Sequence, residues 1–368
     1  MAYTTIDDPS EYFQTAIYTG NSSTLAVTSQ GNADIAPDWI WIKRRSADST
    51  HALFDSTRGR AKSLGSEAND AEFNTSDTAK DLISFDANGF TVGPANQRNT
   101  NGNNETFVAW QWAVNGGTTT TTHSNGATNK VDDNVLQLNT TAGIAIVTYT
   151  GVEDDNGNSP IFVHNLGGVA EFVLVKNRSQ DDNWAVLHKD VSASGGTKSL
   201  ILNTNAAVST SPDPFDGNPG ANNGVFVKGQ PSAVHEVNAD GESYVAYCFR
   251  SIQGYSKIGT YTGDGSTNGV FVHTGFKPAW IIVRATDQDE WRIYDNKRAN
   301  AFNLINVRLK AHAVSAESQD DNECDFVSNG IKFRSNSGGV NTGAQTYTYM
   351  CFAESPFVSS KGTPTTAR

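Results

Sequence analysis

Tyr-Thr-Gly occurs three times in the sequence, each time at the end of an apolar stretch: Tyr18-Thr19-Gly20, Tyr149-Thr150-Gly151 and Tyr261-Thr262-Gly263. A second apolar stretch follows each of them and ends in a cation: Trp39-Ile40-Trp41-Ile42-Lys43, Phe172-Val173-Leu174-Val175-Lys176 and Trp280-Ile281-Ile282-Val283-Arg284. Short stretches rich in β-branched and aromatic residues are typical of buried central strands. Motifs that recur in one order indicate an internal repeat.

Three further elements recur in the same order. A third strand is expected at 51–55, 184–188 and 291–295, and Asn-Gly turns follow at Asn88, Asn223 and Asn329. Asn-Gly accepts the positive φ that tight hairpin turns require. An aromatic closing strand is expected at 106–112, 243–249 and 346–352. Five matched elements in constant order predict three copies of one β-domain.

The predicted fold class is all-β, with three tandem antiparallel β-sandwich domains of jelly-roll or lectin-like type. The predicted divisions are an N-terminal arm (1–11), unit 1 (12–115), a Thr/Asn-rich linker (116–141), unit 2 (142–252), unit 3 (253–357) and a C-terminal tail (358–368). The linker predicts that unit 1 stands apart, whereas the short connection 250–255 predicts that units 2 and 3 pack as a pair. The best helix candidate is 303–313, which an extended conformation also fits. The tail is expected to be mobile.

The composition and charge limit the classes of binding partner that the chain could have. A net charge of −12, with no run of basic residues, argues against nucleic-acid binding, which requires clustered Lys and Arg. The first ten residues lack the basic and apolar regions of a secretory signal, and no apolar run is long enough for membrane insertion. We therefore expect synthesis in a cytoplasm. The three cysteines do not suggest a disulfide framework.

The residues that define the repeat are the candidate signature positions. They are Tyr18, Gly20, Trp39, Trp41, Asp55, Arg58, Trp110, Trp112, Tyr149, Gly151, Trp184, Tyr261, Gly263, Trp280, Trp291, Asp295 and Arg298. The Trp-x-Trp pairs 39/41 and 110/112 could stack on sugar rings. However, residues i and i+2 of a strand share a face, and in a sandwich that face is usually the core. Core packing is the favoured interpretation.

An Asp-x-x-Arg motif occurs at 55–58 and 295–298 but is absent from unit 2. It could provide a catalytic carboxylate with a cationic partner. A turn closed by an ion pair is favoured, because no second carboxylate recurs at fixed spacing.

The other candidate sites have simple structural explanations. Asp154–Asn158 resembles a calcium loop but lacks the distal Glu of a complete one, so a hairpin turn is favoured. Cys248 and Cys351 occupy equivalent positions in two closing strands, which indicates small core residues and not nucleophiles. No phosphate loop, nucleophile elbow, metal-ligand spacing or dinucleotide fingerprint is present. We predict no cofactor, no metal and no enzymatic activity.

Three stretches carry a family resemblance: 291–298 (WRIYDNKR), 349–357 (YMCFAESPF) and the opening 6–15 (IDDPSEYFQT). They resemble recurring signatures of structural proteins of tailed bacteriophages, marine ones in particular. The resemblance covers roughly the whole chain and implies a virion component, often placed with tail fibres. No catalytic residues belong to the motif.

The resemblance leads to three hypotheses for function. The first is an exposed appendage, a tail fibre or fibre-like protein that contacts a host glycan or protein receptor. The second is a capsid decoration or cement protein, with the N-terminal arm docked on a neighbour. The third is a glycan-degrading enzyme, which would need two carboxylates in a cleft. Other virion proteins are the expected partners, and a homo-oligomer is expected because virion parts follow the symmetry of their attachment point.

Overall fold

The computed structural model describes residues 3–365 apart from 96–97, 124–127, 153–158, 193–197, 210–213, 216–222, 229–235, 288 and 299–302. The chain is nearly all β, with 46% strand and 3% helix, which confirms the predicted fold class. Among the described residues, no helix combines the length and apolar character that a membrane crossing requires. The Asp154–Asn158 stretch, considered above as a calcium loop, lies outside the described residues.

Unit 1 is built on a four-stranded antiparallel sheet preceded by the short helix η1 (Pro9–Glu11). The sheet runs in the order β1 (Phe13–Thr19), β9 (Thr106–Trp112), β3 (Trp39–Arg44) and β4 (His51–Asp55). A second sheet consists of β2 (Leu25–Val27), β8 (Gly89–Val92) and β7 (Leu82–Asp86). A separate two-stranded sheet pairs β5 (Lys62–Ser63) with β6 (Phe73–Asn74). The predicted first, second, third and closing strands are all present.

Unit 2 has the same central order with extra strands at both edges. Its sheet runs β10 (Thr120–His123), β11 (Asp132–Asn139), β12 (Ile144–Thr150), β18 (Ser243–Phe249), β14 (Phe172–Asn177), β15 (Ala185–His188) and β16 (Leu200–Ile201). A small sheet pairs β13 (Ile161–Val163) with β17 (Gly224–Phe226), and α1 spans Lys189–Ser192. Strands β10 and β11 fall in the segment predicted as a linker. That prediction was wrong, because β11 pairs along β12 and buries Leu136.

Unit 3 forms a single eight-stranded sheet that curves into a nearly closed barrel. The order is β19 (Ser256–Thr262), β26 (Thr346–Pro356), β21 (Phe276–Ala285), β22 (Arg292–Asp295), β23 (Ile305–Lys310), β24 (Ser318–Val327), β25 (Gly330–Phe333) and β20 (Phe271–His273), and α2 spans Gly338–Asn341. The helix candidate 303–313 was wrong. It contains β23, in which Ile305 and Leu309 are buried by sheet pairing and packing.

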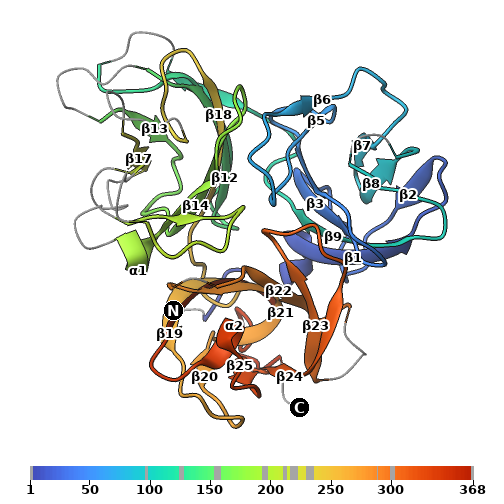
Figure 1. Ribbon diagram of the computed structural model, residues 1–368, viewed down its shortest axis with the longest axis vertical. Coiled ribbons are helices and arrows are strands. Elements are labelled where there is room, and N and C mark those ends of the chain that lie inside the picture. The colour runs from blue at the N-terminus through green and yellow to red at the C-terminus, as the bar shows by residue number, and fades with distance from the viewer. Residues whose placement is uncertain are drawn as a thin grey trace.

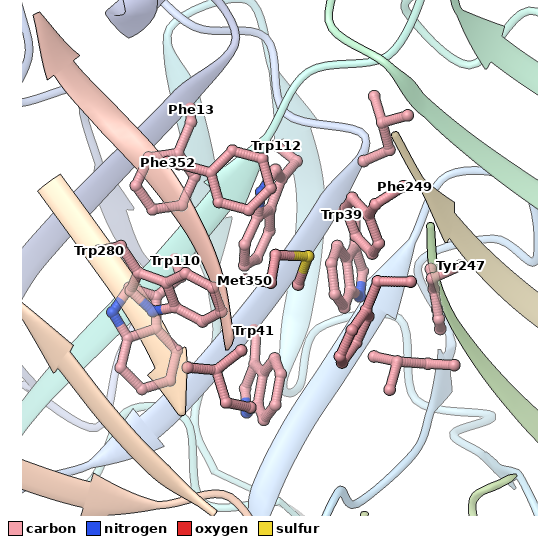
Figure 2. Packing of buried hydrophobic residues seen from close by; sticks show 14 of the residues in the cluster. Phe13, Trp39, Trp41, Trp110, Trp112, Tyr247, Phe249, Trp280, Met350 and Phe352 are labelled. Atoms are coloured by element: carbon pink, nitrogen blue, oxygen red, sulfur yellow. The ribbon is translucent and has the colours of Figure 1, made fainter. Parts of the chain in front are cut away.

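The three units surround a common centre and form three lobes (Figure 1). Their large aromatic side chains meet in one core that contains residues of all three units, among them Trp39, Trp110, Tyr247, Trp280 and Phe352. Figure 2 shows this cluster between strands of different units. The prediction that unit 1 stands apart on a linker was therefore wrong. Its tryptophans are as central as those of units 2 and 3.

Strand alternation explains why the central strands are apolar on both faces. Trp39 and Trp41 point into the shared core, whereas Ile40 and Ile42 point into the core of unit 1 itself. Units 2 and 3 have their own inner cores as well. Because successive side chains of a strand face opposite ways, a near-continuous apolar sequence is required when both faces are covered.

Both chain ends pack on unit 3. The Tyr3 hydroxyl donates to the Gly275 carbonyl (2.7 Å), and Ile6 is buried in the shared core. In the tail, Val358 pairs with Pro364, and the Ser360 backbone N–H donates to Asp7 (2.6 Å). The expectation of a mobile tail does not account for these contacts in its described part.

Candidate functional site

The Tyr-Thr-Gly motif has the same structural role in each unit. The tyrosine rings stack on the first aromatic residue of the closing strand, with ring centroids 5.1, 5.0 and 5.0 Å apart for Tyr18, Tyr149 and Tyr261. Each hydroxyl donates to a backbone carbonyl at 2.6–2.7 Å. The glycines are required by space. A Cβ at Gly20, Gly151 or Gly263 would lie 2.1–2.3 Å from a backbone oxygen. The tyrosine and glycine of the motif therefore have a structural role.

The motif analysis missed an asparagine that completes this arrangement. Asn101, Asn238 and Asn341 are fully buried, and each side-chain oxygen accepts the backbone N–H of the residue after the motif glycine. All three precede the stacked aromatic residue of the closing strand by the same spacing. That constant spacing was the available signal.

The tryptophans form the centre of the molecule. All seven have exposed fractions of 1% or less, so core packing is confirmed and no indole face is accessible to a sugar. The packing differs from the expected one, because the indoles of Trp39 and Trp41 lie between units and not inside a sandwich. Trp39 stacks on Tyr247 of unit 2 (4.5 Å), and Trp112 meets Trp280 of unit 3 edge-on (5.7 Å).

The Asp-x-x-Arg motifs are turns closed by ion pairs, as favoured from the sequence, but both pairs are fully buried. In unit 1 the Arg58 guanidinium binds the Asp55 carboxylate and donates to the Leu53 carbonyl (3.1 Å). In unit 3 Arg298 binds Asp295 at 2.6 Å and donates to the Ile293 carbonyl (3.0 Å). Burial makes an unpaired charge costly, so each pair must be completed by further hydrogen bonds.

Those further hydrogen bonds come from a neighbouring unit. At the boundary between units 1 and 2 (boundary 1/2), the Tyr247 hydroxyl donates to Asp55 at 2.6 Å. At the boundary between units 3 and 1 (boundary 3/1), the Trp110 indole donates to Asp295 at 3.0 Å. Trp110 and Tyr247 occupy the same position of the closing strand. The buried ion pairs therefore connect units.

A glutamate extends each pair to an arginine of the neighbouring unit. Glu72 binds both Arg58 and Arg178 at boundary 1/2, and Glu317 binds both Arg298 and Arg45 at boundary 3/1. Although burial opposes it, hydrogen bonds and charge from Arg178 and Arg58 lower the pKa of Glu72 to about 2. Boundaries 1/2 and 3/1 thus each have an alternating chain of acidic and basic groups.

The boundary between units 2 and 3 (boundary 2/3) has no such chain among its described residues. His188 stands where Asp55 and Asp295 stand, and Met350 stands where Tyr247 and Trp110 stand. Burial lowers the pKa of His188 to about 4, so this imidazole is neutral near pH 7. The absence of the motif from unit 2 is therefore matched by the absence of a donor in unit 3.

A third set of contacts closes the ring. Trp184 donates to Gly65 of unit 1 (2.8 Å), and Trp291 donates to Ile201 of unit 2 (2.7 Å). The equivalent His51 lies 3.1 Å from the Lys310 carbonyl of unit 3 through Nε2, and its Nδ1 accepts the Trp41 indole N–H (2.8 Å). Each unit binds the preceding one in the same way, which gives the molecule approximate threefold symmetry.

A cavity opens at the surface of boundary 3/1. At boundary 3/1 a cavity of about 260 Å³ lies between η1, β1 and the 30–32 segment of unit 1 and the 296–297 and 353–355 segments of unit 3. Hydrogen-bonding groups dominate its lining. They include Thr15, Gln30, Asn296, Lys297 and Glu354.

The cavity lies where the other units carry an acid. Asp38 and Glu171 immediately precede the second strand in units 1 and 2, and Ala279 holds that position in unit 3. Asp38 contacts the Ser56 hydroxyl (2.7 Å), and Glu171 binds the Lys189 ammonium (2.8 Å). A methyl group cannot fill that space or bond the equivalent Asn296, so Asn296 donates to Glu354 instead (2.9 Å).

Metal and thiol chemistry find no support in the described part of the chain. No group of three or more His, Cys, Asp or Glu residues is placed to hold a metal ion there. The three cysteines are free and buried, and burial raises the pKa of the Cys248 thiol. Cys248 and Cys351 belong to the inner cores of units 2 and 3, which confirms their interpretation as core residues.

The repeat residues and the cavity can be compared with known families. A family model described as a domain of unknown function, DUF7483, matches residues 8–356. The chain belongs to the DUF7483 family. The match spans all three units, so the family unit is the whole three-lobed body and not the single β-domain. No curated protein and no solved structure gives a significant match.

Proposed function

We propose that this DUF7483 chain is a non-enzymatic structural component of a tailed-phage virion, an exposed appendage that contacts the host surface. The observation that supports it best is the closed ring of three β-units around one aromatic core. A rigid scaffold of this kind holds its loops in place while their sequences vary. The resemblance of the repeat motifs to tailed-phage structural proteins supplies the virion context.

The ring favours a compact knob or fibre tip over a row of separate beads. Its approximate threefold symmetry suits attachment to a threefold-symmetric partner, such as the end of a trimeric fibre. Other virion proteins would hold the body, and the outer loops would contact a glycan or protein receptor. The homo-oligomer expected from the sequence stays a prediction.

The test is to locate the protein and to measure its binding. Antibody labelling of particles should place it on the tail or its fibres, and purified protein should bind host cells and compete with particle adsorption. Purified protein that neither binds host cells nor slows adsorption would argue against the appendage role.

A capsid decoration protein is the second candidate, and the lobed shape favours it. Viewed down its shortest axis the molecule shows three lobes about a centre, an outline that suits a threefold position of a capsid shell (Figure 1). Labelling on the shell, together with heat-sensitive particles when the protein is missing, would support this role over the appendage.

A glycan-degrading enzyme remains the third candidate, with less structural support. Glycosidases usually employ two carboxylates across the bond that is cleaved. The cavity at boundary 3/1 is lined by one carboxylate, that of Glu354, among its described residues. Release of oligosaccharide from host glycan, abolished by Glu354→Gln, would establish this activity.

A further inference from the structure

We infer that the cavity at boundary 3/1 binds a single sugar unit through residues of both units 1 and 3. This inference rests on the proposed function and deepens it, because it names the class of ligand and the place of contact. The cavity holds about 260 Å³, which suits a small molecule and not a polymer segment.

Hydrogen-bonding capacity in the cavity is left unused. Thr15 is 3% exposed, and its hydroxyl has no hydrogen-bond partner among the described residues. A buried hydroxyl without a partner is costly, and Thr15 is one of the residues that line the cavity. Among the described residues the Lys297 ammonium makes one hydrogen bond, to the Gln30 carbonyl (3.1 Å), and it has two further N–H groups. Thr15 on the unit 1 side of the cavity and Lys297 on the unit 3 side therefore offer hydrogen-bond donors and acceptors.

The surrounding side chains are held in place before any ligand arrives. The Gln14 amide nitrogen donates to the Ser10 and Ala33 carbonyls (2.8 and 2.6 Å), and its oxygen accepts the Gln30 and Gly31 backbone N–H groups. The Gln30 amide in turn pairs with the backbone of Ile17 at the edge of β1. A wall fixed in this way loses little conformational entropy on binding.

The charge pattern favours a polyhydroxyl ligand, neutral or anionic, over a cationic one, because the Lys297 ammonium binds only a carbonyl in the described part of the chain. The Glu354 carboxylate is neutralised by the Lys277 ammonium at 3.0 Å and oriented by Asn296. It therefore accepts hydrogen bonds without requiring a cationic partner. Amide, hydroxyl and paired carboxylate groups are complementary to the hydroxyls of a sugar, which both donate and accept.

Boundary 1/2 shows what occupies the equivalent place. At boundary 1/2 the residues equivalent to Asn296 and Lys297 are Ser56 and Thr57, and both contact the Gln137 side chain of β11 at 3.0 and 2.6 Å. Unit 1 has no described strand beyond β1 in its sheet, and in place of such a strand only the Gln30 segment lies along β1 and accepts the Lys297 ammonium. Loss of the acid at position 279 and of the covering strand together leave the cavity open.

Two variants test the site on the full chain. Ala279→Asp restores the residue of unit 1 and places a carboxylate in the cavity beside Asn296, and Thr15→Val removes the unpaired hydroxyl while keeping its shape. Thr260→Val is the matched control, since Thr260 is an exposed strand residue that does not line the cavity. Saturation-transfer NMR would be recorded with glucose, galactose, mannose, N-acetylglucosamine and glucuronate, and with glutamate and glycine betaine as non-sugar probes.

The parent protein and Thr260→Val should give a signal with at least one sugar. Ala279→Asp should abolish it, and Thr15→Val should weaken binding by about three- to tenfold, the effect of one lost hydrogen bond. No signal from any sugar, a signal from the non-sugar probes alone, or a sugar signal unchanged in both variants would overturn the inference.

Host-cell binding separates this inference from the proposed function. If purified parent protein and Ala279→Asp bind cells equally well, the appendage role stands and the sugar site is not its contact. If the sugar signal depends on Ala279 and Thr15 but the protein is absent from particles, the site stands and the virion role fails.

Discussion

The indole nitrogen of Trp110 lies 3.0 Å from the Asp295 carboxylate, across the boundary between units 1 and 3. The equivalent donor of unit 2, Tyr247, lies 2.6 Å from Asp55 of unit 1. Where the third donor would stand, unit 3 has Met350, and the acid that it would face is replaced by His188. Donor and acid are thus present together or absent together at all three boundaries.

Neutralising Asp295 should destabilise the protein strongly. Asp295→Asn removes the buried carboxylate that Arg298 binds at 2.6 Å and leaves Arg298 only the more exposed Glu317, which costs about 3–5 kcal/mol in the free energy of unfolding. Urea unfolding followed by tryptophan fluorescence measures this change. The control is Asp77→Asn, since the Asp77–Lys80 pair is 47% and 42% exposed and contributes at most about 1 kcal/mol. Equal effects of the two variants would contradict the structural role of the buried pair.

Removing the hydrogen-bond donor Tyr247 from boundary 1/2 should lower the stability more than a substitution at boundary 2/3, which has no such donor among its described residues. Tyr247→Phe leaves the Asp55 carboxylate one hydrogen bond short, for a loss of about 1–3 kcal/mol. Met350→Leu at the equivalent position of unit 3 conserves volume and should cost less than about 1.5 kcal/mol. Urea midpoints of the two variants provide the comparison, and a larger loss for Met350→Leu would be the contrary result.

The motif glycines should not accept a methyl group. Gly263→Ala places a Cβ 2.2 Å from the Thr342 carbonyl oxygen, and relieving that clash should cost about 1–3 kcal/mol. Gly343→Ala is the matched control, because the nearest atom to its Cβ would be 3.7 Å away. Thermal unfolding of both variants decides the matter, and the prediction fails if Gly263→Ala melts with or above the parent protein.

Acidification should weaken the fold between pH 6.5 and 4. Burial lowers the pKa of His164 and of His188 to about 4, so below pH 6.5 the unfolded chain binds protons that the folded chain does not. Stability is therefore present above pH 6.5 and falls toward pH 4, by about 3 kcal/mol for each histidine. Urea unfolding across this range measures the slope.

A variant isolates the histidine contribution. His164→Gln with His188→Gln should reduce the slope between pH 6.5 and 4 relative to the parent protein, while His51, whose pKa burial also lowers, contributes equally in both proteins. Burial raises the pKa of Glu67, so this carboxyl makes the folded state more stable as the pH falls, opposite to the histidines. The variant and the parent protein are therefore compared at equal pH, where the Glu67 contribution is the same in both. Glu72, with a pKa of about 2, acts mainly below pH 4.5. An unchanged slope in the double variant would rule out the two histidines as its cause.

A single unit should not be stable as a soluble monomer. A fragment of residues 253–357 would expose the faces of Trp280, Met350 and Phe352 that units 1 and 2 cover in the full chain. Exposed apolar surface of this extent promotes association. Size-exclusion chromatography with light scattering should show oligomers or aggregates. A monomeric fragment with fixed near-ultraviolet circular dichroism would contradict the shared core.

Local patterns predicted the strands and the repeat well. The first, second and closing strands of each unit lie where short apolar, β-branched and aromatic stretches placed them, because such stretches follow from burial of both strand faces. The helix candidate 303–313 was wrong since buried Ile305 and Leu309 at helical spacing also fit a strand whose pairing is set by distant partners. The Thr-rich stretch was misinterpreted for a related reason. Polar threonines on an edge strand show no apolar periodicity.

The sequence did not predict how the three units pack against one another. Trp39 and Trp41 were correctly expected to be buried, yet the same pattern fits a face inside a sandwich or a face between sandwiches. The cavity at boundary 3/1 was not predicted, because it depends on an acidic side chain that units 1 and 2 have and unit 3 lacks. Ala279 becomes informative only when its position is compared with Asp38 and Glu171 in space.

The covalent joining of the three units has a consequence for how the family can diversify. In a trimer of identical chains, every substitution appears at all three contacts at once, so a change that opens one of them opens all. Here each contact is encoded by its own stretch of DNA. One can lose an acid at position 279, another can exchange an ion pair for Met350 and His188, and the remaining contacts still hold the body together. Duplication and fusion thus allow new binding surfaces to arise at one contact without dissolving the assembly.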